Sequence, residues 1–276
     1  MDYCFLNGDI LSLQEARIGI DDIGVLRGYG VFDFLRVYNG EPFLFKEHME
    51  RLRNSASLLG LSVPYPEEDI KETIYSLIEK NQKKDANVRI VLTGGKAISG
   101  IDPDTENPTF FILMEEATLI PKEWIKEGVK LVSMEYKRPL PEAKTLDYLV
   151  PVRERKRMKE EGAVEILYFY DDLILEGSTS NIFLVKEEKI ITPHEGVLRG
   201  TTRNFVIELA KKEGFEVEER DVKVEELEEA GEVFLTATNK EILPVSQIDD
   251  KGVGEGPGKV NSLLLKKFKE KTGSTT

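Results

Sequence analysis

Short apolar segments typical of β-strands alternate irregularly with amphipathic segments typical of α-helices along the whole chain. Met49, Leu52 and Ala56 recur at the spacing of one helix face. Residues 31–38, in contrast, form a continuous aromatic and β-branched run, which favours a strand. This alternation predicts an α+β fold with mixed sheets and flanking helices, and it argues against a doubly wound parallel sheet.

Turn dipeptides and apolar runs locate the expected elements. Asn7-Gly8 and Asn39-Gly40 are turn signals between strand-like runs, so each predicts a pair of strands. The predicted strands cover residues 3–7, 10–13, 31–38, 42–46, 87–93, 108–115, 129–136, 164–170, 172–175, 182–186, 189–192, 232–237 and 241–245. The predicted helices cover residues 46–59, 67–82, 147–161, 201–213 and 259–270.

A loop-like segment with Pro121 interrupts the chain near its middle. We therefore predict a small N-terminal α+β domain over residues 1–117, an interdomain linker over 118–126, and a large C-terminal domain over 127–276. A chain of 276 residues is long enough for two domains of ordinary size, each with its own core.

Charge and residue inventory argue against several function classes. The chain has 38 Lys and Arg against 51 Asp and Glu, a net charge of −13, whereas a nucleic-acid binder needs a basic excess. Cys4 is the one cysteine, and His48 and His194 are the two histidines, so we expect no disulfide framework and no metal site. The first residues lack the pattern of a signal peptide, and no apolar run reaches about 18 residues, so we expect a cytoplasmic protein without a membrane partner.

Four polar clusters lie at the ends of predicted elements. They are residues 141–148 with Lys144, Glu176–Asn181, Leu198–Asn204 and Thr236–Lys240. Taken singly, each has an ordinary explanation as a surface lysine, a bulge, a helix cap or a polar turn. The Gly-Thr-Thr start of the predicted helix at 201–213 is also suited to phosphate, because backbone N–H groups and the helix dipole meet there.

In this order and spacing, the clusters resemble those of the fold-type IV aminotransferases, which depend on pyridoxal 5'-phosphate (PLP). That group includes branched-chain aminotransferases, D-amino-acid transaminases and aminodeoxychorismate lyases. The resemblance covers nearly the whole chain and includes Arg27–Asp33, His48–Leu52, Lys144, Glu176–Asn181, Leu198–Arg203 and Thr238–Pro244. It implies a two-domain fold, a PLP cofactor and a homodimer that acts on amino acids and 2-oxo acids.

The resemblance assigns the central chemistry to Lys144, which would form a Schiff base with the cofactor and then carry the proton between substrate and cofactor. Glu176 would pair with the pyridine nitrogen, which keeps the ring an electron sink. Arg51 would bind the phosphate with its guanidinium fork.

The remaining cofactor residues follow from the same resemblance. Thr201, Thr202 and Thr238 would donate hydrogen bonds to the phosphate, and Leu198 would pack under the ring. Tyr148 would lie near the ring hydroxyl, and Asn181 would hold the turn of Glu176. The chain departs from the usual motif at Asp33, Asp147 and Thr201, none of which removes a reactive group.

The substrate is less firmly indicated. A divergent group of D-amino-acid transaminases resembles this chain in having Arg27, which reaches the substrate carboxylate across the dimer interface, and a lysine equivalent to Lys240. Thr179 stands where some members have a further arginine, and Asn239 adjoins Lys240. Arg89 instead matches an arginine of branched-chain enzymes.

Our first hypothesis is a transaminase that moves an amino group between D-alanine or D-glutamate and pyruvate or 2-oxoglutarate. The alternative is a branched-chain L-amino-acid transaminase. A lyase of the aminodeoxychorismate type and a non-catalytic PLP-binding protein are lesser alternatives.

Overall fold

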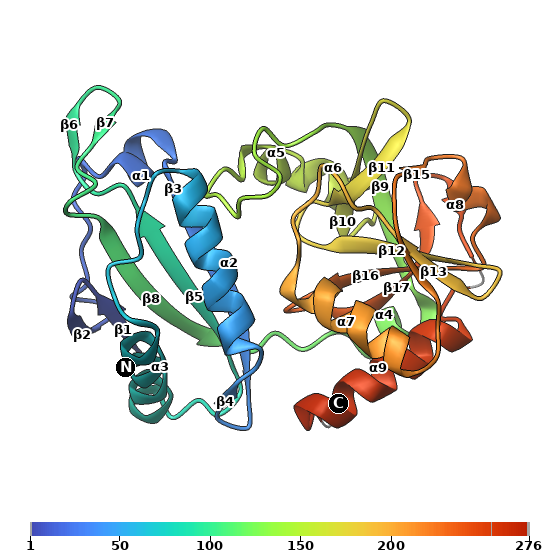
Figure 1. Cartoon of the computed structure of the whole chain (residues 1–276), viewed down its shortest axis with the longest axis horizontal. Coiled ribbons are helices and arrows are strands. Elements are labelled where there is room, and N and C mark those ends of the chain that lie inside the picture. The colour runs from blue at the N-terminus through green and yellow to red at the C-terminus, as the bar shows by residue number, and fades with distance from the viewer. Residues whose placement is uncertain (1, 255, 275–276) are drawn as a thin grey trace. The chain divides into compact units, whose positions relative to one another are not determined.

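The computed structural model describes residues 2–254 and 256–274, which form two compact units (Figure 1). Unit 1 comprises Met1–Thr118 and Ala143–Tyr148, and unit 2 comprises Leu119–Glu142 and Leu149–Thr276. Ala143–Tyr148 thus packs with unit 1, although the sequence analysis assigned it to the C-terminal domain. The reason is long-range backbone pairing: Phe32 N donates to Lys144 O, at 2.9 Å.

Unit 1 is built on an antiparallel sheet with the strand order β2-β1-β8-β5-β3-β4. Its strands are β1 (Tyr3–Leu6), β2 (Asp9–Ser12), β3 (Gly30–Tyr38), β4 (Glu41–Pro42), β5 (Ala86–Thr93) and β8 (Thr109–Glu116). The short strands β6 (Ala97–Ser99) and β7 (Asp102–Pro103) form a separate hairpin. The helices of this unit are α1 (Ile23–Arg27), α2 (Phe45–Leu58) and α3 (Glu67–Asn81).

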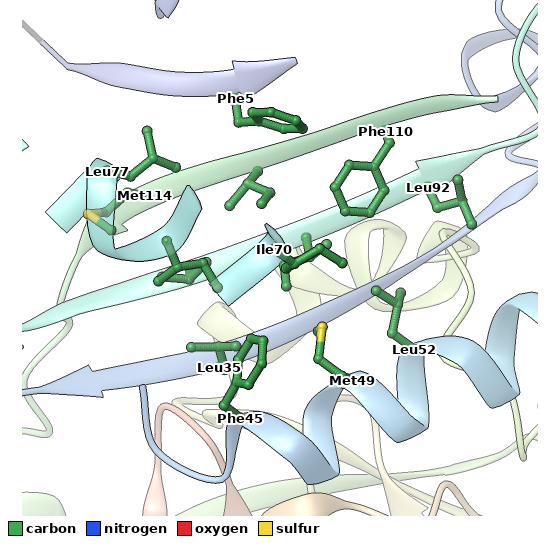
Figure 2. Close-up of a cluster of buried hydrophobic side chains, with 14 of the residues drawn as sticks. Phe5, Leu35, Phe45, Met49, Leu52, Ile70, Leu77, Leu92, Phe110 and Met114 are labelled. Atoms are coloured by element: carbon green, nitrogen blue, oxygen red, sulfur yellow. The ribbon is translucent and has the colours of Figure 1, made fainter. Parts of the chain in front are cut away.

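The core of unit 1 lies between the sheet and the helices α2 and α3. Leu35 of β3 and Met49 and Leu52 of α2 are fully buried in it (Figure 2). Because successive side chains of a strand point to opposite faces, Asp33 lies on the same face as Leu35, beside α2, and Phe32 lies on the other face. The two faces of β3 therefore present different functional side chains.

Unit 2 contains a mixed sheet with the strand order β14-β13-β12-β16-β17-β9-β10-β11-β15, with β18 paired to β17. Its strands are β9 (Val129–Glu135), β10 (Glu165–Tyr170), β11 (Leu173–Gly177), β12 (Asn181–Lys186), β13 (Lys189–Thr192), β14 (Val217–Glu219), β15 (Val222–Lys223), β16 (Glu232–Ala237), β17 (Glu241–Ile248) and β18 (Lys251–Gly252). Its helices are α4 (Lys122–Glu127), α5 (Leu149–Arg153), α6 (Arg155–Glu160), α7 (Thr201–Lys212), α8 (Glu226–Glu229) and α9 (Lys259–Thr272). The neighbours β17·β9, β9·β10 and β13·β14 are parallel, and the other pairs are antiparallel.

The predicted fold class is confirmed, and two local predictions are wrong. The strand predicted at 42–46 ends at Pro42, because Phe45 begins α2 and buries its ring in the core. The helix predicted at 147–161 is two short helices that begin only at Leu149. The region 118–126 contains most of α4, which begins directly after Pro121. Proline is tolerated at a helix start because the first N–H groups of a helix have no partner within the helix. None of the helices in the described ranges is long and apolar enough to span a membrane.

Candidate active site

Lys144 is held by backbone contacts on both sides of its loop. Its N–H donates to Ser55 Oγ of α2 at 3.1 Å, and its carbonyl accepts from Phe32 N at 2.9 Å. Leu146 N donates to Gly30 O at 3.0 Å, so the loop pairs with the start of β3 like a further strand. Two elements of unit 1 therefore fix the position of the lysine backbone.

The ring of Phe32 gathers three of the residues predicted for the site. Lys144 Nζ lies 4.6 Å and Arg89 Cζ 5.6 Å from the ring centroid. The ring of Tyr148 meets it edge-on, with centroids 5.5 Å apart. Arg89 extends from β5, where it also pairs with Glu115 at 3.2 Å. Two basic side chains and a phenol thus lie around one aromatic ring.

Arg51 lies beside the apolar face of α2, where an exposed side chain would be ordinary, but it is largely buried. Its side chain is 11% exposed, and it forms a two-point ion pair with Asp33, with Nε and Nη2 each 2.8 Å from a carboxylate oxygen. His48 Nδ1 lies 2.6 Å from the same carboxylate. Burial raises the pKa of Asp33, but Arg51 and His48 outweigh it and hold that pKa well below its usual range. The carboxylate is ionised, and within the described chain Nη1 of Arg51 is left for an anion.

The burial of His48 predicts an acid sensitivity that is specific to this residue. Burial lowers the pKa of His48 in spite of Asp33, so the folded state keeps the ring neutral where the unfolded chain binds a proton, below about pH 6.5. The free energy of unfolding is expected to fall with pH from there by up to about 1.4 kcal/mol per pH unit. Urea unfolding of the apoprotein between pH 7 and pH 5 measures this slope.

In this experiment His48→Gln should flatten the slope between about pH 6.5 and pH 5. His194→Gln is the matched control, because the side chain of His194 is 39% exposed, and it should keep the wild-type slope. Equal slopes for wild type and His48→Gln would contradict the prediction.

In unit 2, Glu176 is fixed at the end of β11 by two donors. Its side chain is 5% exposed, and Oε1 accepts from Arg138 Nε at 2.8 Å. Its second oxygen, Oε2, accepts from Leu198 N at 2.9 Å. Arg138 is a site residue that sequence reasoning missed, because it lies 38 residues away and no local motif marks it. The result is a carboxylate that is ion-paired with Arg138 and has a fixed direction.

Gly200, Thr201 and Thr202 at the start of α7 lie close to Asn181 and Leu198, and we call these three residues the α7 cradle. Asn181 Nδ2 donates to Leu198 O at 2.7 Å, and a Cβ on Gly200 would lie 2.2 Å from Asn181 Oδ1, so a side chain at position 200 would displace the Asn181 amide. Thr201 and Thr202 are buried in the first turn of α7. The structure therefore brings together Asn181, Leu198 and the helix start.

A buried hydroxyl marks the neighbouring strand β16. Thr236 is opposite Asn181 in the sheet, is 1% exposed, and its Oγ1 has no hydrogen-bond partner among the described residues. Thr238 and Asn239 follow in the turn between β16 and β17, and both are partly buried. An unsatisfied buried hydroxyl at this position fits a site that gains a polar ligand.

Lys240 contacts protein groups with all three of its donors. Nζ lies 2.7 Å from Glu165 Oε2, 2.6 Å from Thr179 Oγ1 and 3.0 Å from Ser180 Oγ. Sequence reasoning missed Glu165, which is 1% exposed at the start of β10 and 75 residues away from Lys240. Arg27 differs: it is exposed at the end of α1, and its Nη1 donates to Leu26 O at 2.8 Å.

The described residues contain no group of three or more His, Cys, Asp or Glu side chains able to hold a metal ion. Over residues 30–248 the chain matches the family described as Amino-transferase class IV. The chain belongs to the class IV aminotransferase family. The predicted family and the predicted type of enzyme, a PLP-dependent aminotransferase, are confirmed.

Similar proteins of this family carry two different substrate names. The "Putative branched-chain-amino-acid aminotransferase" of Methanocaldococcus jannaschii is 34% identical over 96% of this chain and 95% of its own length. The "D-alanine aminotransferase" of Bacillus licheniformis is 32% identical over 91% of this chain and 90% of its own length.

Two solved structures share the fold. A branched-chain amino acid aminotransferase with pyridoxamine 5'-phosphate superposes with a TM-score of 0.92, shares 26% identity, and covers 98% of this chain and 94% of its own. The branched-chain amino acid aminotransferase from Escherichia coli superposes with a TM-score of 0.88 at 28% identity, over 100% of this chain and 96% of its own. The chain is thus a class IV aminotransferase with amino acids and 2-oxo acids as substrates, and the relatives leave open which amino acid it uses.

Proposed function

We propose that this aminotransferase moves an amino group between a D-amino acid, D-alanine or D-glutamate, and a 2-oxo acid, with PLP held by Lys144, Glu176, Arg51 and the start of α7. The residues fit this cofactor on structural grounds. Glu176 is a fixed anion for the ring nitrogen, Arg51 keeps Nη1 for a phosphate, and Thr236 has an unsatisfied hydroxyl next to the α7 cradle within the described chain.

When bound, PLP supplies an electron sink for the negative charge that develops at the substrate Cα. Within this chain, Lys144 Nζ removes and returns the proton at that Cα. Leu198 N and Arg138 hold the Glu176 carboxylate in its direction, so that it does not need to reorganise during the reaction. The ring of Tyr148 packs edge-on against Phe32, the same ring over which Lys144 Nζ lies.

The observation that carries the D-amino-acid proposal is the exposed Arg27 on an apolar helix. Val25 is 66% exposed and Leu26 is 44% exposed on α1, and Ile20 just before it is 89% exposed. Exposed apolar side chains gathered in this way favour an interface. We infer a homodimer in which the partner covers α1, so that Arg27 reaches the partner's substrate carboxylate. The Bacillus licheniformis relative supports this proposal.

The second candidate is a branched-chain L-amino-acid transaminase, and Arg89 favours it. Its guanidinium and Lys144 Nζ lie against the same ring of Phe32, so Arg89 is a cation close to the reacting amine. The similarity to the two solved branched-chain enzymes also favours this candidate.

The stereochemistry of the amino donor decides between the two candidates. The PLP-loaded protein is mixed with D-alanine, D-glutamate, L-leucine or L-alanine, and the change of the visible absorption band is followed. We expect the D-donors to react and the L-donors to leave the band unchanged. Reaction of L-leucine without reaction of the D-donors would refute the proposal.

The variant Arg27→Ala tests the carboxylate contact. The loss of one charge-assisted hydrogen bond of about 1.5–3 kcal/mol predicts that KM for D-alanine rises roughly 10- to 100-fold with a small change in kcat. Arg17→Ala is the control, because Arg17 precedes α1 and donates to the nearby carbonyls of Gln14 and Ala16. An unchanged KM in Arg27→Ala would remove Arg27 from the site.

A further inference from the structure

The carboxylate of Glu165 is enclosed by three consecutive residues that follow Glu176 and Gly177. Oε1 accepts from Ser178 Oγ at 3.3 Å, from Thr179 Oγ1 at 2.9 Å and from the backbone N–H of Thr179. Oε2 accepts from Ser180 Oγ at 2.7 Å. One buried side chain of β10 therefore binds every hydroxyl of the segment 178–180.

This segment connects two residues of the candidate cofactor site. It begins after Glu176 and ends before Asn181, and the backbone closes it, with Gly177 N donating to Ser180 O at 2.8 Å. A Cβ on Gly177 would lie 2.8 Å from Glu165 Oε1, so the glycine lets the carboxylate approach the turn closely. Glu165 therefore holds the turn that directly follows Glu176.

Lys240 completes the network as its counter-charge. An ammonium group has three donors, and those of Lys240 all point to Glu165, Thr179 and Ser180. Each of the two hydroxyls accepts from Lys240 and gives its single donor to Glu165. Burial raises the pKa of Glu165, but Lys240 and the hydroxyl donors outweigh it and lower that pKa, so the carboxylate is ionised.

We propose that Glu165 and Lys240 are a positioning pair: Glu165 holds the turn Gly177–Ser180 that orients Glu176, and Lys240 neutralises Glu165 instead of binding a substrate carboxylate. This inference rests on the proposed function for the role of Glu176. It replaces the role that the sequence predicted for Lys240, because a substrate carboxylate could bind Nζ only after one of its three bonds is broken.

The test compares Lys240→Gln, Glu165→Gln and the double variant by three measurements. They are the Kd of PLP for the apoprotein, the urea midpoint of the apoprotein, and the KM and kcat of the loaded enzyme. Each single variant leaves one buried charge unpaired, so we expect the Kd of PLP to rise at least about 10-fold and the midpoint to fall. The double variant should return to within about 3-fold of the wild-type Kd, since neither charge remains.

Two controls complete the comparison. Lys240→Arg keeps the charge and should keep the Kd of PLP within about 3-fold, and Lys223→Gln changes a lysine of unit 2 whose side chain is 65% exposed and should change nothing. If Glu165→Gln does not fold, the contrast between Lys240→Gln and Lys240→Arg decides in the same way.

The opposite result is equally distinct. If Lys240 binds the substrate, Lys240→Gln raises KM at least about 10-fold and leaves the Kd of PLP and the urea midpoint unchanged. The double variant then has the same raised KM as Lys240→Gln. This result would overturn the inference. If the wild type binds no PLP, the proposed function and the orienting role fail together. The midpoints of the apoprotein still test the ion pair separately in that case.

Discussion

The variant Lys144→Ala is expected to lower kcat for every amino donor at least about 1,000-fold, because it removes the amine that moves the substrate proton. The backbone of Lys144 is fixed by Ser55 and Phe32, so removal of its side chain should leave the loop in place. The measurement is single-turnover conversion of D-alanine and L-leucine, together with the absorption spectrum after addition of PLP.

Lys126→Ala is the matched control, because Lys126 is exposed at the end of α4, and it should keep wild-type turnover. Retention of wild-type turnover in Lys144→Ala would refute the assignment of the reacting amine. If Lys144→Ala loses activity only because the proton-carrying amine is absent, a small primary amine such as methylamine should restore part of the activity.

The second large effect is expected for Glu176→Gln. The amide carries no charge to keep a ring nitrogen protonated, and the loss of one preorganised electrostatic contact predicts a kcat/KM about 100- to 1,000-fold lower. Arg138 keeps its bond to Pro141 O but loses its carboxylate partner, so the apoprotein should also lose about 2 kcal/mol of unfolding free energy.

Glu195→Gln is the control for this variant, because Glu195 is exposed in the loop before α7, and neither measurement should change. A Glu176→Gln enzyme with wild-type kcat/KM would show that the carboxylate does not act on the ring nitrogen. A loss of stability without a loss of activity would assign Glu176 a structural role through Arg138 alone.

Local sequence patterns predicted most elements because the forces that form them act over a few residues. The helices α2, α3, α7 and α9 follow from apolar residues at helical spacing, and the Asn7-Gly8 turn joins β1 to β2. The strand predicted at 42–46 is wrong after Pro42, because the apolar residues there fit a strand as well as the start of a helix. Only the core contact of Phe45 decides between the two.

The partners of the charged residues could not be predicted in the same way. Glu165 and Lys240 lie 75 residues apart, and Arg138 and Glu176 lie 38 apart, so the pairing depends on strand register and loop path. A sequence shows that a lysine is present, but it does not show whether a substrate or a buried carboxylate neutralises it. For Lys240 the resemblance suggested the substrate, and the structure provides Glu165.

The sequence by itself indicated the class of enzyme, because a lysine, an acid and a Gly-Thr-Thr helix start in this order and spacing resemble those of the fold-type IV aminotransferases. It also determined the α+β fold, because periodicity of apolar residues is a local property. Only the tertiary structure decided that residues 143–148 pair with β3, that Asp33 holds Arg51 and that Glu165 holds Lys240. The ion pairs among these contacts depend on burial, because a buried charge without a partner is costly. The partner that the fold places beside it can be distant in the sequence.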